Sequence, residues 1–111
     1  MECECRPSEL LFTQTTISST FTNGTSIHDL IDKIKREREY DSGLLPLEVA
    51  RDRYDGELYC NNNRRLYLFR VLEKEGYISK IRVKVVNSVR PKAAETGHRI
   101  RFRDGTPIRN Y

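Results

Sequence analysis

The chain has 111 residues, enough for one small domain and too few for two separate cores. Hydrophobic residues make up 37% and charged residues 32%, which suits a globular protein with a modest core and a heavily charged surface. No apolar run approaches the roughly 20 residues that cross a bilayer, and the acidic start of the chain does not resemble a secretory signal. We therefore expect a protein of the cytoplasm or nucleus with no membrane partner.

The cysteines and histidines do not predict a metal site. The number of cysteines is odd, and Cys3 and Cys5 are only one residue apart, which favours reduced thiols in a reducing compartment. A structural zinc site needs four ligands at recognisable spacing. Cys60, His28 and His98 are scattered along the chain. We expect no bound metal ion.

The net charge of +4 is unevenly distributed along the chain. Residues 76–111 carry nine Lys or Arg and two acidic residues, a net charge of +7, which leaves −3 for residues 1–75. A basic C-terminal third favours polyanions such as nucleic acid or acidic protein surfaces, although a solubilising tail has the same composition. We expect a disordered start (residues 1–9), a folded domain (residues 10–87) and a basic C-terminal extension (residues 88–111).

The first half of the domain has the pattern strand, helix, strand. Apolar and β-branched residues at 10–17 predict a strand, and Thr25 or Ser26 predicts the start of an amphipathic helix over residues 27–40. A second strand is predicted over residues 44–50. The dipeptide Asp55-Gly56 signals the turn of a hairpin whose returning strand covers residues 57–60.

The second half has the pattern helix, strand and basic tail. A helix is predicted over residues 64–75, with Gly76 as its C-terminal cap. Apolar residues alternate with basic ones after residue 78, which predicts a half-buried strand. Residues 99–103 read as an edge strand, or else as a tail that orders only with a partner. The whole predicts an α+β fold, a small mixed sheet with two main helices.

A run of three asparagines and two arginines joins the hairpin to the second helix. Asparagine tolerates the left-handed backbone conformation and caps helices well, so the turn can be tight and the helix start defined. The helix N–H groups, the helix dipole and the guanidinium groups of Arg64 and Arg65 would then converge on one place, which suits a phosphate group. The alternative is that the two arginines are solvated or paired with surface carboxylates.

This order of elements resembles the ParB/sulfiredoxin-like superfamily over residues 10–86. In ParB proteins the motif before the second helix reads Gly-Glu-Arg-Arg, and in sulfiredoxin it reads Gly-Cys-His-Arg. The matching stretch here is Asn62-Asn63-Arg64-Arg65, followed by an apolar helix. The strands at residues 45–49 and 80–85 and the hairpin at 55–59 also resemble those of the family.

The resemblance implies a ParB/sulfiredoxin-like fold and a nucleotide site that takes ATP or CTP with Mg²⁺. Carried over by position, the predicted phosphate-binding residues are Arg64, Arg65, Asn63, Asn62 and Ser26. The tail would extend the contact to a nucleic-acid backbone through Arg99, Arg101 and Arg103.

Two departures from the family argue against its usual chemistry. Sulfiredoxin's catalytic cysteine and ParB's glutamate both fall at Asn63, which has neither a thiol nor a carboxylate that accepts a proton. Cys60 is expected to face the core, so sulfinic-acid repair is not expected. The lysine at the start of sulfiredoxin's first helix falls at Asn23, which should weaken triphosphate binding by about 1.5–3 kcal/mol.

Three functional hypotheses follow. The leading one is a nucleotide or nucleic-acid phosphate-binding domain of ParB-like type. The second is an enzyme acting on phosphates (a ParB-like nuclease, an NTPase or a small-molecule kinase), for which the candidate carboxylates are Asp29, Asp55 and Glu57. The third is a degenerate, non-catalytic scaffold that binds a protein partner.

Overall fold

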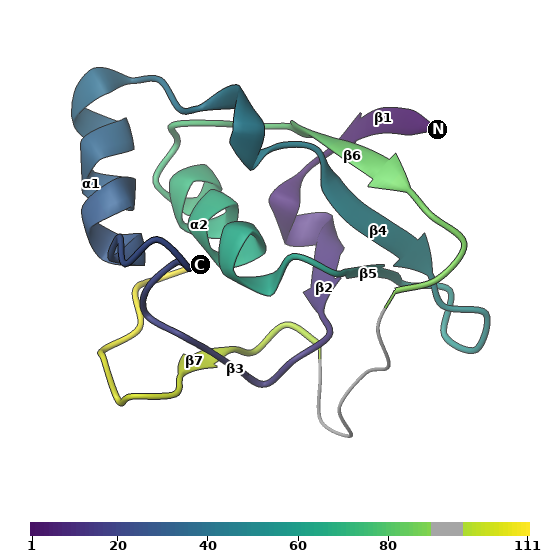
Figure 1. Ribbon diagram of the computed structural model, residues 1–111. Helices are drawn as coiled ribbons and strands as arrows, with labels where there is room; N and C mark the ends of the chain where they lie inside the picture. The colour runs from purple at the N-terminus through teal and green to yellow at the C-terminus, as the bar shows by residue number, and fades with distance from the viewer. Residues whose placement is uncertain (90–96) are drawn as a thin grey trace.

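The computed structural model describes residues 1–89 and 97–111. The fold is α+β, with a five-stranded mixed sheet, two α-helices and a two-stranded ribbon within this part of the chain (Figure 1). The strands are β1 (Glu2–Cys5), β2 (Leu10–Phe12), β3 (Thr16–Ile17), β4 (Leu47–Arg51), β5 (Leu58–Cys60), β6 (Ile81–Val85) and β7 (Arg101–Phe102). The helices are α1 (Ile27–Glu37) and α2 (Asn63–Lys74), and the short 3₁₀ helices are η1 (Pro7–Glu9) and η2 (Ser42–Leu44).

The large sheet has the strand order β1-β6-β4-β5-β2. Strands β4 and β5 form the predicted antiparallel hairpin, and Gly56 in its turn has a φ of +74°, a conformation that favours glycine. Strand β6 pairs in parallel with β4, and β2 pairs in parallel with β5. The hairpin at the centre of the sheet therefore leads directly into α2.

The start of the chain is ordered, contrary to the expectation of a disordered segment over residues 1–9. Strand β1 pairs antiparallel with β6, which places Glu2 opposite Lys84 and Glu4 opposite Arg82. Opposite charges on directly opposed residues stabilise a strand pair. The acidic start is therefore complementary to the basic outer positions of β6, and Cys5 at its end is buried.

The strand predicted over residues 10–17 is two strands in two different sheets. Strand β2 ends at Phe12, because the backbone N–H of Thr13 donates to Oδ1 of Asn63 at 2.9 Å rather than to a neighbouring strand. The chain then turns, and β3 pairs in parallel with β7. The break carries the chain across the N-terminal end of α2.

Helix α1 begins as predicted and ends earlier than predicted. The hydroxyl of Ser26 accepts the Asp29 N–H at 3.4 Å, which caps the helix start. The helix ends at Glu37 because Arg38 adopts a left-handed conformation with a φ of +56°. Its apolar stripe is buried against the core.

Helix α2 lies between the sheet, α1 and the C-terminal segment (Figure 1). From Leu66 to Leu72 every residue is buried, including the charged Arg70. A helix that is buried on all sides carries apolar residues on all sides, which explains why its sequence has only a weak amphipathic pattern. The position of α2 is therefore fixed from every direction.

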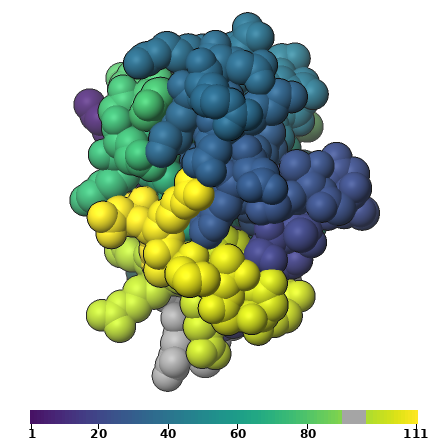
Figure 2. Space-filling view, turned by 90° about the vertical axis from the view of Figure 1, so that its left-hand side faces the viewer, coloured from purple at the N-terminus to yellow at the C-terminus, as the bar shows by residue number. Residues whose placement is uncertain are grey.

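Residues 97–111 of the C-terminal extension pack on the domain (Figure 2). Phe102 of β7 is buried and makes an edge-to-face contact with Tyr67, with ring centroids 5.2 Å apart. The guanidinium group of Arg109 forms a two-hydrogen-bond ion pair with Asp32 of α1, at 2.7 and 3.1 Å. The Tyr111 ring packs on Phe12 and Tyr67. The extension thereby closes the core beside α1 and α2.

The hydroxyl of Tyr67 joins three parts of this core. It accepts the backbone N–H of Arg109 at 3.0 Å, and Nε2 of His28 lies 2.8 Å away. The hydroxyl has a single proton, and it donates this proton to Nε2 when Nε2 is unprotonated. Burial, and then the charge of Arg109, lower the pKa of His28 below its usual 6.5, against the opposing effect of Asp32 and Asp29.

We predict that stability falls as the pH drops below about 6.5, because His28 takes up its proton more readily in the unfolded chain than in the folded one. Urea unfolding between about pH 5 and pH 7.5 measures this slope. The variant His28→Gln removes the titrating group and should flatten the curve. Asp32, whose pKa Arg109 lowers, titrates at more acidic pH and does not contribute in this window. An equal slope in wild type and variant would contradict the prediction.

Candidate functional site

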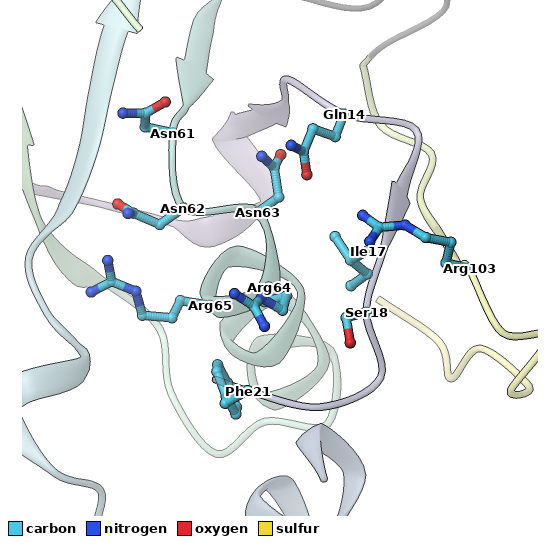
Figure 3. Close-up of a pocket in the computed structure, with 10 residues that line it drawn as sticks. All are labelled: Gln14, Ile17, Ser18, Phe21, Asn61, Asn62, Asn63, Arg64, Arg65 and Arg103. Carbon is cyan, nitrogen blue, oxygen red and sulfur yellow. The ribbon is translucent and has the colours of Figure 1, made fainter. Parts of the chain in front are cut away.

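A pocket of about 320 Å³ lies at the N-terminal end of α2, facing β3 and the segment that follows it (Figure 3). Among the described residues, its lining includes three arginines and no carboxylate. The arginines are Arg64, Arg65 and Arg103, and the amide side chains are those of Gln14, Asn61, Asn62 and Asn63. The pocket is therefore rich in hydrogen-bond donors and positively charged.

Arg64 and Arg65 are each anchored to a backbone carbonyl group. Nη1 of Arg64 donates to the Thr20 carbonyl at 2.7 Å, and its guanidinium group lies 5.7 Å from the centre of the Phe21 ring. Nη1 of Arg65 donates to the Leu44 carbonyl at 3.2 Å. Carbonyl groups orient a guanidinium group without neutralising its charge. Within the described residues neither arginine forms an ion pair.

The two arginine side chains diverge from the helix start (Figure 3). Arg64 extends toward Phe21, whereas Arg65 extends away on the other side of α2. From the sequence we expected both guanidinium groups to converge on one place. Instead they lie at separate parts of the lining, an arrangement that suits an extended anion with several charged groups better than one small ion.

The asparagine turn forms differently from the prediction. Asn62 occupies the N-cap position with a φ of −106°, and its side chain makes no hydrogen bond to the helix. Its Oδ1 instead accepts the backbone N–H of Glu48 at 2.8 Å, while Nδ2 of Asn61 donates to the Glu48 carboxylate at 3.1 Å. The two asparagines thus tie the turn to β4. Among the described residues no side chain caps α2, which leaves the N–H groups of its first turn without a capping side chain there.

Asn63 has a structural role through its side chain. The side chain is buried, with 5% of the residue exposed, and both of its polar atoms bond to Thr13. Oδ1 accepts the Thr13 N–H and Nδ2 donates to Oγ1 of Thr13, each at 2.9 Å. The polar atoms of its side chain are therefore already bonded to Thr13. Asn63 lines the pocket because it is the first residue of α2.

Ser26 does not line the pocket among the described residues. Its hydroxyl caps α1, and the residue forms an isolated bridge with Thr20, the residue whose carbonyl group holds Arg64. The start of α1 is thus connected to the pocket through Thr20.

The structure separates the three tail arginines. Arg103 lines the pocket, because its backbone N–H donates to the Ile17 carbonyl at 2.8 Å and extends the β3–β7 pairing. Arg101 lies on β7 outside this pocket, and Arg99 is exposed just before β7. The sequence indicated the tail as basic but gave no sign of which arginine reaches the helix.

Five lining residues were not predicted as site residues: Gln14, Ile17, Ser18, Phe21 and Asn61. Gln14, Ser18 and Phe21 come from the polar connection around β3. Phe21 was identifiable only as an apolar anchor in that connection. Gln14 and Ser18 carry no recognisable signal, because they reach the pocket only after the chain turns at Thr13.

The candidate carboxylates for phosphate chemistry lie elsewhere. Asp55 accepts a hydrogen bond from the Tyr59 hydroxyl at 2.7 Å within the hairpin, and Glu57 is exposed there. Asp29 lines a separate groove along α1. No group of three or more His, Cys, Asp or Glu residues that suits a metal ion occurs among the described residues. Burial raises the pKa of the Cys60 thiol to about 12, so it is an inert core residue.

Comparison with known proteins assigns this chain to no family. No protein-family model, curated protein or solved structure matches this chain. In residues 1–89 and 97–111, no helix combines the length and the apolar character that crossing a membrane requires. The site must therefore be interpreted from its own residues.

We predict that Asn63→Ala lowers the free energy of unfolding by about 1–3 kcal/mol, because it leaves buried polar groups of Thr13 without partners. Urea unfolding measures this loss. In a double-mutant cycle with Thr13→Ala the two losses should couple rather than add. Additive losses would show that the Asn63–Thr13 contact contributes little.

Proposed function

We propose that this domain binds the phosphate groups of a nucleotide or nucleic acid in the pocket at the start of α2. One observation carries the proposal: three guanidinium groups and an uncapped helix N-terminus share a concave pocket whose described lining holds no carboxylate. Helix N–H groups and guanidinium groups are the donors that proteins most often present to phosphate.

Electrostatics supports an anion of more than one charge. The pocket gathers three formal positive charges, and the positive end of the α2 dipole adds to them. The guanidinium groups are held by carbonyl groups or lie free of ion pairs among the described residues, so no described carboxylate is paired with their charge. A ligand with several phosphate groups satisfies this arrangement.

The ParB/sulfiredoxin-like resemblance belongs to the same proposal. Arg64 and Arg65 stand where that superfamily places its phosphate ligands, and ATP or CTP with Mg²⁺ is the ligand it implies. The proposal is one of binding rather than turnover, because the described lining offers no carboxylate for proton transfer and Asn63 is engaged with Thr13.

We predict that Arg64→Gln and Arg65→Gln each weaken binding of CTP, ATP or a short oligonucleotide about tenfold to a hundredfold, because each removes a charged hydrogen bond. Titration calorimetry of the folded variants measures the change. Glutamine removes the positive charge and keeps a polar side chain with an N–H donor. The control is Arg53→Gln, which removes the same charge from an exposed residue of the hairpin turn.

Three outcomes would contradict the proposal. Unchanged affinity in both pocket variants would remove the site, and an equal loss in Arg53→Gln would reduce it to a net-charge effect. If the wild type binds none of these ligands, with or without Mg²⁺, the hypothesis of a protein-binding scaffold takes its place. Release of phosphate or cleavage of the oligonucleotide would show an enzyme instead.

A further inference from the structure

The positively charged surface continues beyond the pocket. A second hollow of about 440 Å³ lies on the outer side of the β3–β7 ribbon, lined in part by Thr16, Arg101 and Thr106. Arg103 lines both hollows. The two hollows therefore adjoin at Arg103.

The strand geometry places Arg101 and Arg103 on one face. Phe102 between them is buried against Tyr67, with 4% of the residue exposed. Side chains alternate along an extended chain, so Arg101 and Arg103 both point outward. Their Cα atoms are about 6.6 Å apart along the chain. Thr16 stands opposite Arg101 in the parallel register and shares this outer face. A hydroxyl group and two guanidinium groups thus form a row.

The arginines of this row form no ion pair within the described part of the chain. No ion pair or side-chain hydrogen bond joins Arg101 or Arg103 to another described residue. The acid nearest in sequence, Asp104, accepts hydrogen bonds from the Ser19 hydroxyl and the Thr106 N–H, at 2.5 and 3.0 Å. Its carboxylate is directed to those two partners.

We infer that the ligand of this site is a single-stranded nucleic acid whose phosphates follow one another from the pocket onto the outer face of the ribbon. Arg64 and Arg65 hold the backbone in the pocket, Arg103 holds it at the junction, and Arg101 holds the next phosphate. The inference rests on the proposed phosphate-binding function and names its ligand class. A mononucleotide fills the pocket and leaves Arg101 unused.

A single strand fits this path better than a duplex. The path leaves a recessed pocket and continues over a ribbon, which requires a backbone that bends within one or two nucleotides. Double-stranded DNA is stiff over about 150 base pairs, and its phosphates lie on a convex surface. Phe21 in the pocket supplies an aromatic ring beside the path, and proteins that bind single strands combine a basic groove with such rings.

The test compares three probes on one set of variants. The probes are a fluorescein-labelled oligothymidine of about 12 nucleotides, a DNA duplex of the same length, and CTP. The variants are Arg101→Gln, Arg101→Lys and the control Arg53→Gln, all at exposed positions. Fluorescence anisotropy over a series of salt concentrations, with calorimetry for CTP, gives the affinities, and circular dichroism confirms that each variant is folded. An oligouridine arm distinguishes RNA from DNA as the preferred strand.

The expected result is a loss confined to the oligonucleotide. Arg101→Gln should weaken oligothymidine binding about three- to tenfold and lower the slope of log K against log salt by about 0.7, which is one phosphate contact. Arg101→Lys should keep most of the slope, and CTP binding should not change. The duplex should bind more weakly than the single strand.

Each other result overturns the inference. If Arg101→Gln leaves the oligothymidine slope unchanged while Arg64→Gln and Arg65→Gln still weaken CTP binding, the path along the ribbon is wrong and the proposed function stands. Duplex binding as tight as that of the single strand overturns the ligand class. If neither oligothymidine nor CTP binds the wild-type protein, the inference and the proposed function fail together.

Discussion

The contact between Asn63 and Thr13 determines where the main parts of this fold meet. It joins the first residue of α2 to the residue after β2 through both polar atoms of one amide. Because Thr13 is engaged in this way, β2 stops and the chain crosses the helix start instead of continuing along the sheet. The wall of the pocket and the position of β3 both follow from this buried pair.

The same amide helps to explain why the start of α2 has no side-chain cap at Asn62. A polar residue at the start of a helix usually caps it, but here Asn63 binds Thr13 and Asn62 binds the backbone of β4. Both side chains stabilise the surroundings of the helix start rather than the start itself. No described side chain caps the first turn of α2, and Arg64, Arg65 and Arg103 line the same pocket from separate positions.

Much of the fold could be predicted from the sequence because its signals are local. The cap at Ser26, the turn at Gly56 and the alternation in β6 each depend on neighbouring residues, and each element formed near its predicted bounds. The ordered start and the division of residues 10–17 could not be predicted. Both depend on partners far along the chain, β6 for the first and Asn63 for the second.

The candidate site was predictable only in its centre. Adjacent arginines before an apolar helix indicated an anion site, but the directions of their side chains depend on the carbonyl groups of Thr20 and Leu44, which no local pattern indicates. Arg103 was one basic residue among many in the tail. Arg103 reaches the pocket because of the register of β7 against β3, which the buried Phe102 fixes.

The parallel pairing of β3 with β7 has a consequence for the order of folding. Its two strands come from opposite ends of the chain, so the ribbon closes one of the largest loops in the molecule, and such long-range pairings form late. Arg64 and Arg65 belong to α2, whereas Arg103 joins the pocket lining through the pairing of β3 with β7. The lining of the pocket is therefore complete only after this long-range pairing has formed, so the pocket depends on tertiary folding and not on the helix start alone.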